Sequence, residues 1–480
     1  MRIGDNNQSS IRRGIGLAIA ALLSFTSASV CRADDEKTNF TTVGAMKAFL
    51  PEGKVPGKAT GGLPFSIVLT DSGKTISGNT FALKLPGTEK SVQVTFLGLM
   101  YSDGHLTGQV QIKDTAGSSI EGLRLDIESA TETYKAKDAQ GLEVIKTRSQ
   151  NVSLASPLLF GDLKEEEENA PVSFSAGPLS FAPETTQIAV HGKLSGLLYV
   201  QSLSFPEASS GGQIDLDAKG RIYLSSVGGN QVARMDNDGK NVVVAAKLPD
   251  GCIGMAVNPK TGEIAANCTN HQKIFLFTAG GDDKGSIGEA QGLDNYAHWQ
   301  RYDANGVLWS TVNSTLVKFG PDGKAVFKLT KAGEYDLDGD SAFDVTADGT
   351  IYTLANKTLF RISPDGKTAR RIAIGPGGKL GQLSEPKSCR VDANGDVYVS
   401  EDRSEALKQA ARISVFDREG NFVRAFGRGA QTPLADYPDT YYAGQIYEPA
   451  DIAFGPDGRV YLSCSRKAEN GAYVMVFQRF

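Results

Sequence analysis

The second half of the chain repeats one unit, and this repeat constrains the fold more than any other feature. Each unit has an apolar strand, a tight turn that ends in glycine, and a second strand that often carries tyrosine or tryptophan. The Asn-Gly and Asp-Gly pairs in these turns supply the positive φ that a two-strand hairpin needs. Six starts are visible, at residues 213–224, 255–266, 300–309, 343–352, 390–399 and 451–462.

Most units add a third strand and a second glycine turn, as in 316–328. Four strands at a spacing of roughly 40 residues are typical of β-propeller blades. The last unit has only three strands before the chain ends, and the strand-like run 197–205 stands before the first unit. We therefore expect an all-β fold with a six-bladed β-propeller over residues 196–480. The run 197–205 is predicted to close the ring as the outer strand of blade six, because closure removes exposed sheet edges.

The fifth unit also carries a family resemblance. Residues 385–402, followed by 412–427, resemble the NHL repeat over nearly its full length, and the sixth unit is similar to it as well. The resemblance implies an NHL-type propeller. Because NHL propellers include protein-binding scaffolds, RNA-binding modules and enzymes, it implies a fold and not one activity.

Residues 34–195 lack the repeat and are expected to form a separate β-sandwich domain. Alternating apolar runs such as 65–69, 92–96 and 123–127 are separated by turns rich in Gly, Pro and Asp. This pattern is typical of sandwich strands. The segment 160–191 resembles the last strands of Ig-like or fibronectin-like modules, and the charged run 164–168 within it is expected to be a solvated loop.

The first 33 residues predict a signal peptide. Arg12 and Arg13 precede an apolar stretch at 15–25, and small residues lead to a cleavage site after Ala33. A stretch of about a dozen apolar residues is shorter than the roughly 20 that span a bilayer. Lipidation at Cys31 and a twin-arginine signal are alternatives that fit their motifs less well. We therefore expect an exported protein, periplasmic or extracellular, without a transmembrane segment.

The charge of the chain bears on its partners. A net charge of −5 and a pI near 5.6 give no support for a nucleic-acid partner or for attachment to an anionic membrane. An RNA-binding role, known for other NHL propellers, therefore does not fit. The sequence gives no indication of an oligomeric state.

Four of the five cysteines remain after cleavage at the predicted site. Cys252 and Cys268 are equidistant from the 259–262 turn, so a hairpin places them opposite each other. Cys389 and Cys464 fall on neighbouring blades. In an oxidising compartment we expect the disulfides Cys252–Cys268 and Cys389–Cys464. Small buried thiols are the alternative.

The loops at the two ends of the ring differ in length. Turns at one end are short, whereas the other end carries the connections 280–296, 331–340, 375–387 and 427–448 and the insertion 403–411. Long loops on one rigid face are where binding residues gather. We therefore expect this face to engage a protein or glycan ligand, which makes an exported binding or scaffold protein the first functional hypothesis.

Several residues of this face are candidates for contact with a ligand. Tyrosines crowd the loop before blade six, and tyrosine offers contact area with a hydrogen-bonding tip. The ligand-binding candidates are Asp250, His271, His298, Lys387, Arg403, Tyr441 and Tyr442. Asp336, Asp338 and Asp340 alternate as in a calcium loop, so calcium is the candidate cofactor; a solvated acidic turn is the alternative.

A metal-dependent propeller enzyme is the second functional hypothesis. The calcium-dependent gluconolactonase family shares the fold type and holds its metal in Glu-Gly-Pro, Pro-Asn-Gly and Pro-Asp-Gly settings. Here Glu207 is followed by Ala-Ser-Ser, and no Pro-Asn-Gly occurs. The Pro-Asp-Gly at 249–251 matches only one element of the set and is offset by the extra residues 252–254. The set is incomplete. A hydrolase or lyase that uses calcium or zinc therefore stays the alternative, and the sequence identifies no catalytic residue.

Overall fold

The molecule is almost entirely β-structure. The computed structural model describes residues 40–41, 62–71, 79–86, 88–102, 104–152, 154, 158–163, 167–182, 185–205, 211–226, 229–268, 270–288, 293, 297–338, 341–404, 406–407, 409–427, 446–466 and 471–480. The predicted signal peptide, with its cleavage site, lies outside these ranges. Within them, no helix has the length and apolar character needed to cross a membrane.

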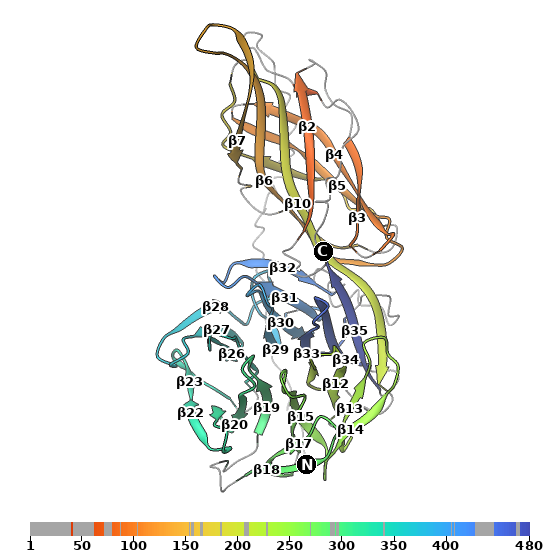
Figure 1. Ribbon diagram of the computed structural model, residues 1–480, viewed down its shortest axis with the longest axis vertical. Coiled ribbons are helices and arrows are strands. Elements are labelled where there is room, and N and C mark those ends of the chain that lie inside the picture. Colours follow the sequence, from red (N-terminus) through yellow and green to blue (C-terminus); the bar gives the residue numbers. More distant parts are fainter. Residues whose placement is uncertain are drawn as a thin grey trace, which may run out of the picture. The chain divides into compact units, whose positions relative to one another are not determined.

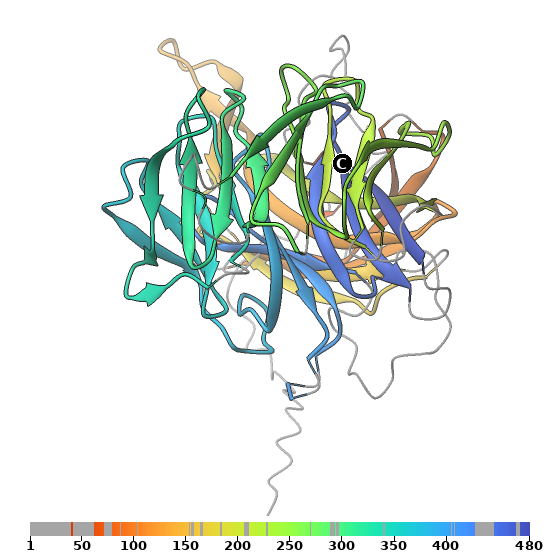
Figure 2. The same cartoon turned by 90° about the horizontal axis from the view of Figure 1, so that it is seen from below.

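The C-terminal part is the expected six-bladed propeller (Figure 1; Figure 2). Each of the first five blades is a four-stranded antiparallel sheet with its strands in chain order. Blade one contains β11 (Ile214–Leu216), β12 (Ile222–Ser225), β13 (Gln231–Met235) and β14 (Val243–Lys247). Blade two contains β15 (Cys252–Val257), β16 (Ile264–Cys268), β17 (Ile274–Phe277) and β18 (Asp283–Ile287). Blade three contains β19 (Ala297–Tyr302), β20 (Leu308–Val312), β21 (Thr315–Phe319) and β22 (Ala325–Leu329).

The remaining blades follow the same plan. The short pair β23 (Lys331–Ala332) and β24 (Tyr335–Asp336) stands between blades three and four. Blade four contains β25 (Phe343–Val345), β26 (Ile351–Ala355), β27 (Thr358–Ile362) and β28 (Ala369–Ala373). Blade five contains β29 (Glu385–Val391), β30 (Val397–Asp402), β31 (Arg412–Phe416) and β32 (Phe422–Phe426). The first strand of every blade contacts the first strand of the next, from β11 round to β33 (Pro449–Phe454) and back, so the ring is closed.

Blade six draws its outer strand from before blade one. Its own strands are β33, β34 (Arg459–Arg466) and β35 (Gly471–Arg479). The C-terminal half of β10 (Thr185–Phe205) pairs antiparallel with β35, from Leu197 opposite Arg479 to Phe205 opposite Ala472. The N-terminal half of the same strand belongs to the preceding β region. The predicted boundary between residues 195 and 196 therefore falls inside one continuous strand.

One local motif explains why the repeat was visible in the sequence. An aspartate ends each of several first strands, and one of its carboxylate oxygens accepts hydrogen bonds from the amides two and four residues later. In blade one, Asp217 Oδ1 lies 2.9 Å from Lys219 N and 3.0 Å from Arg221 N. Asp303 and Asp392 make the same pair of bonds. The glycine before the second strand then takes a positive φ, 77° at Gly220, which a residue with a Cβ rarely adopts.

The N-terminal β region consists of two sheets around one core. One sheet joins β1 (Phe40–Thr41), β2 (Leu63–Asp71), β10, β6 (Ile120–Lys137), β7 (Glu143–Asn151) and β8 (Leu158–Leu163). The other contains β3 (Asn79–Lys84), β4 (Ser91–Ser102), β5 (His105–Asp114) and β9 (Val172–Ala176). Phe65 of the first sheet packs 5.7 Å from Phe96 of the second, measured between ring centroids. Alternate residues of β4, from Val92 to Phe96, are fully buried in the shared core.

Candidate functional site

A cavity of about 560 Å³ opens at the mouth of the propeller channel. Its walls come from all six blades, at or near the starts of the first strands and, in blades four and five, also at the ends of the second strands. The lining residues are Gly212, Gln213, Ile253, His298, Trp299, Asp338, Ser341, Leu354, Asn356, Lys357, Pro386, Lys387, Asp402, Glu448, Pro449 and Ala450. We call this cavity the mouth pocket. The first strands all start at this end, where the long connections enter, so the mouth pocket lies on the face where the sequence predicted binding.

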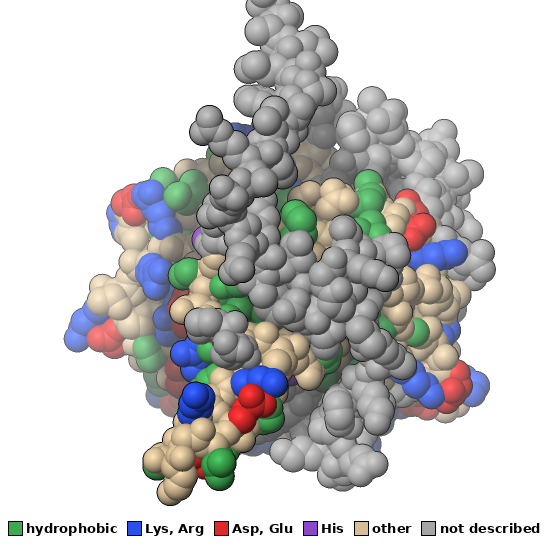
Figure 3. All heavy atoms as spheres, turned by 90° about the horizontal axis from the view of Figure 1, so that it is seen from above, with side chains coloured by type: hydrophobic (Ala, Val, Ile, Leu, Met, Phe, Trp, Pro, Cys, Tyr) green, Lys and Arg blue, Asp and Glu red, His purple; other side chains and the backbone are tan. Residues whose placement is uncertain are grey.

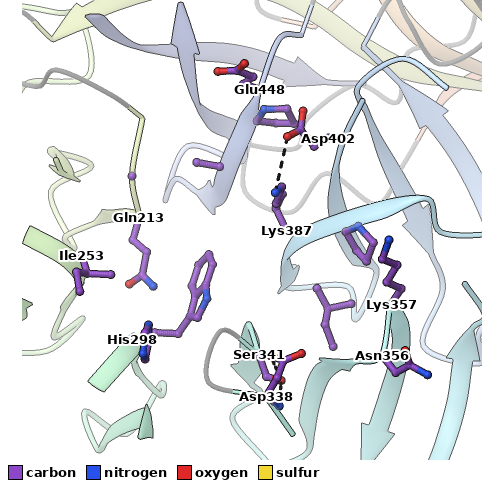
Figure 4. A pocket seen from close by; sticks show the side chains of 16 residues that line it. Gln213, Ile253, His298, Asp338, Ser341, Asn356, Lys357, Lys387, Asp402 and Glu448 are labelled. Carbon is purple, nitrogen blue, oxygen red and sulfur yellow. Dashed lines mark hydrogen bonds and ion pairs between the residues drawn. The ribbon is translucent and has the colours of Figure 1, made fainter. Parts of the chain in front are cut away.

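The side chains of the mouth pocket form a ring around the opening (Figure 4). Gln213, Ile253 and His298 lie on one side, and Asn356 and Lys357 lie on the other. Glu448 and Asp402 occupy one end of the view, and Asp338 and Ser341 the opposite end. The wall thus combines apolar side chains with amide, imidazole, ammonium and carboxylate groups.

Charged contacts hold part of this ring in place. Lys357 Nζ lies 2.7 Å from the Glu385 carboxylate, and Lys387 Nζ lies 3.7 Å from Asp402 Oδ2. The Ser341 hydroxyl donates to Asp338 Oδ1 at 2.9 Å, which fixes the turn before blade four. None of the described residues pairs with the Glu448 carboxylate.

Below the mouth pocket, buried ion pairs close the channel. Arg301 of blade three places Nη2 2.8 Å from both carboxylate oxygens of Asp451 in blade six, and both side chains are at most 2% exposed. Arg390 of blade five lies 3.3 Å from Asp215 of blade one and 3.8 Å from Asp344 of blade four. We call these five residues the channel floor. Blade three is therefore joined to the opposite blade six, and blade five to blades one and four.

The aspartates of the channel floor also connect neighbouring blades. Each accepts a backbone N–H from the next first strand: Val257 N lies 3.0 Å from Asp215 Oδ2, and Val391 N lies 2.8 Å from Asp344 Oδ2. Ile214 N donates to Asp451 Oδ2 at 3.1 Å across the junction that closes the ring. Burial works to lower the pKa of Arg390, but the surrounding carboxylates outweigh it and raise that pKa, so the Arg390 guanidinium stays charged.

These contacts bear on whether the channel suits a metal ion. A calcium site needs six or more oxygen ligands that converge on one point, several of them from carboxylates. The floor carboxylates instead face guanidinium groups and backbone amides. Asp336 pairs with Lys331 Nζ at 3.2 Å, whereas Asp338 lines the mouth pocket, and Asp340 lies outside the described residues. In the described part of the chain, no three or more His, Cys, Asp or Glu side chains gather where they could hold a metal.

The other predicted ligand candidates divide into three groups. His298 and Lys387 line the mouth pocket, as Asp338 does. Asp250 and His271 belong to blade two outside it: Asp250 accepts a hydrogen bond from the Asn270 amide, and the His271 ring packs edge-on against Phe275. Arg403 follows Asp402, but its guanidinium lies over the Tyr447 ring, 5.7 Å from the centroid, outside the lining. Tyr441 and Tyr442 lie outside the described residues.

Several lining residues were missed by sequence reasoning, among them Trp299, Lys357, Asp402 and Glu448. The signal available was positional, because first strands begin and second strands end at this face. Trp299 and Glu448 lie near the starts of β19 and β33, and Lys357 and Asp402 lie at or just after the ends of β26 and β30. Glu448, immediately before β33, has φ of 41°, a conformation uncommon outside glycine and asparagine. Its backbone is held by a hydrogen bond from Ser465 N to Glu448 O.

The two predicted disulfides are not formed. Cys252, Cys268, Cys389 and Cys464 are all free, buried thiols. Cys252 and Cys268 are ladder partners across β15 and β16, as expected, but a bulge follows Cys252 and its Sγ points to Gly254 O, 3.6 Å away along its own strand.

The second disulfide fails for a different reason. Cys389 Sγ lies 3.7 Å from Ala342 O and from Tyr352 O, so its thiol faces blade four. Cys464 instead belongs to the hydrophobic cluster between blades five and six. Burial raises the pKa of both thiols.

By sequence, the chain matches no family model and no curated protein. Solved structures do resemble it. A gluconolactonase from Xanthomonas campestris has 15% identity and a TM-score of 0.43, covering 59% of this chain and 90% of its own. Regucalcin, a calcium-binding protein from Agrobacterium tumefaciens, has 15% identity and a TM-score of 0.41, covering 59% and 96%.

A third similar structure is that of virginiamycin B lyase from Staphylococcus aureus. It has 12% identity and a TM-score of 0.38, and the match covers 84% of this chain and 100% of that one. At such low identities these likenesses extend to the type of fold alone. The six-bladed propeller is established here by the closed ring of four-stranded sheets and the ladder that joins β10 to β35.

Proposed function

We propose that this chain is an exported binding protein whose NHL-type propeller takes a protein or glycan ligand into the mouth pocket. The observation that carries the proposal is the mouth pocket itself: its volume lies within the roughly 300–1,000 Å³ of ordinary ligand sites, and all six blades contribute to its wall. The ion pairs of the channel floor close its lower end, so a ligand enters and leaves by one side. Export rests on the sequence of residues 1–33, and an Ig-like N-terminal module on segment 160–191.

The distribution of charge supports binding by side chains over binding through a channel metal. The floor carboxylates are matched to arginines and backbone amides. On the described part of the face in Figure 3, Lys and Arg side chains are interspersed with Asp and Glu, and no broad basic patch is present there. The net charge of −5 gives no support for a nucleic-acid ligand.

A metal-dependent hydrolase or lyase is the second candidate, and one observation favours it. His298, Lys387 and Glu448 share the mouth pocket, and imidazole, ammonium and carboxylate groups are the usual proton donors and acceptors of catalysis. Stoichiometric calcium or zinc in the purified protein, together with a thermal shift on chelation, would favour this candidate. Unchanged stability after dialysis against EDTA would count against it.

The binding proposal is tested by filling the mouth pocket. Ala450 lines the cavity at the start of β33, so Ala450→Trp introduces an indole into the space that a ligand needs. We expect binders selected from a glycan array and a random peptide library to bind the wild type and to lose binding to Ala450→Trp. Val326→Ser is the matched control, because Val326 is 61% exposed on the outer strand of blade three. If neither library yields a binder that Ala450→Trp abolishes, the proposal is wrong.

A further inference from the structure

Carboxylates outnumber cationic groups from the channel floor to its mouth. On the floor, three aspartates face two arginines. Among the residues that line the mouth pocket, two lysines face the carboxylates of Asp338, Asp402 and Glu448. The channel therefore carries a surplus of negative charge at both levels. Protein walls of low dielectric constant focus such a field along a cleft and raise the local concentration of cations.

Among the carboxylates of the mouth pocket, Glu448 is the one best placed to bind a cationic group of a ligand. Lys357 forms an ion pair with Glu385, and Lys387 lies near Asp402. Arg403, the cation that follows Asp402 in sequence, is held over the Tyr447 ring. The Glu448 side chain has no partner among the described residues and lies at the same end of the mouth pocket as Asp402 (Figure 4). A cationic group of a ligand placed there would meet two carboxylates and one ammonium group.

The backbone at Glu448 is in the left-handed region, with φ of 41°. This conformation is uncommon for residues other than glycine and asparagine.

The rest of the wall suits an apolar stem behind a charged head. Ile253, Leu354, Pro386 and Pro449 supply apolar surface, and the Trp299 ring supplies an aromatic face. Lysine and arginine have this build, because they pack a hydrocarbon stem against apolar surface and keep the charge at the tip. A neutral sugar ring offers no cationic group to the carboxylate of Glu448.

We propose that the mouth pocket receives a lysine or arginine side chain of a partner protein, with its cationic head beside Glu448. This inference rests on the proposed function, and it narrows the ligand from protein or glycan to a basic segment of a protein. The partner's cation offsets part of the negative charge at the mouth, as Arg301 and Arg390 do on the floor.

The experiment starts from peptides selected on the wild-type protein and counter-selected on Ala450→Trp. We expect enrichment of Arg or Lys at one position. The best peptide is then resynthesised with citrulline, the neutral isostere of arginine, or with norleucine in place of lysine. Affinity is measured by fluorescence anisotropy against wild type, Glu448→Gln and Asp322→Asn. Asp322, 59% exposed in the β21–β22 turn, is the control for loss of one negative charge.

Loss of the peptide charge should weaken binding to the wild type about fivefold, the value of a partly exposed ion pair. Glu448→Gln should weaken the charged peptide equally and leave the neutral peptide unaffected, because both changes remove the same pair. Lys387→Gln should strengthen binding of the charged peptide, and Asp322→Asn should change neither peptide. The proposal is overturned if the selected peptides are neutral or acidic, or if only glycans give binding that Ala450→Trp abolishes. It is also overturned if the affinity lost on neutralising the peptide and the affinity lost on Glu448→Gln add up when both changes are made. If only glycans bind, the proposed function stands, and only the ligand class is wrong.

Discussion

The buried pair between Arg301 and Asp451 gives the sharpest prediction about the channel floor. Asp451→Asn keeps an oxygen that can accept from Ile214 N, but it removes the charge that faces Arg301 at 2.8 Å. The guanidinium is then left buried without its counter-ion. Removing one partner of a buried ion pair costs about 3–5 kcal/mol of unfolding free energy. With a slope of about 3 kcal/mol/M in urea, the unfolding midpoint falls by about 1 M or more.

Intrinsic fluorescence reports this change directly. The chain has two tryptophans, Trp299 and Trp309, and both are in blade three. Trp299 has the Arg301 guanidinium 5.3 Å from its ring centroid, so urea unfolding followed by fluorescence monitors the perturbed blade. The double variant Arg301→Met/Asp451→Asn should recover most of the loss, because no unpaired charge remains. If Asp451→Asn lowers the unfolding free energy by less than about 1 kcal/mol, or if the double variant recovers none of the loss, Asp451 does not compensate the buried charge of Arg301.

Four further predictions follow from single contacts. Glu448→Asn, which suits a φ of 41°, should leave thermal stability unchanged or raise it while it weakens binding of a basic peptide; a loss of both would contradict the role given to its carboxylate. Glu401→Gln should lower the unfolding free energy by about 3 kcal/mol and speed hydrogen exchange at 377–384, because Arg412, 2.9 Å from Glu401, binds Gln382 O in that loop. Gly254→Ala should lower the melting temperature by the equivalent of about 1–3 kcal/mol, since a Cβ there would lie 2.0 Å from His298 O. Burial, with Asp392 adding to it, raises the pKa of Asp396 to about 6, so the folded state holds this proton more tightly than the unfolded chain. Stability should therefore fall as pH rises from about 4 to about 6, and Asp396→Asn should raise the melting temperature at pH 7.5 but not at pH 4.

The propeller was predictable because its signals are local. The aspartate that ends a first strand and the glycine that follows act within one turn, as at Asp217 and Gly220. These turns, with alternating strands on either side, mark each blade without knowledge of its neighbours. The ladder between β10 and β35 followed from counting strands in the last blade.

The composition of the mouth pocket was not predictable in the same way. It depends on which residues six separate blades bring to one end, and Glu448 and Trp299 come from different blades with no shared motif. The cysteines show the same limit, because parity and spacing do not say which way a side chain points. Cys389 faces blade four, although its predicted partner lies on blade six. The boundary between the N-terminal β region and the propeller was not visible in the sequence, because the single strand β10 continues without a break for 21 residues.

The most direct test of the account is the binding isotherm of the best selected peptide, measured on wild type and Ala450→Trp, each in EDTA and in millimolar calcium. Occupancy of the mouth pocket by the ligand itself is the central claim. We therefore expect wild-type binding to be the same in calcium and in EDTA, and to be abolished in Ala450→Trp. Binding that survives in Ala450→Trp, or that requires calcium, would contradict it.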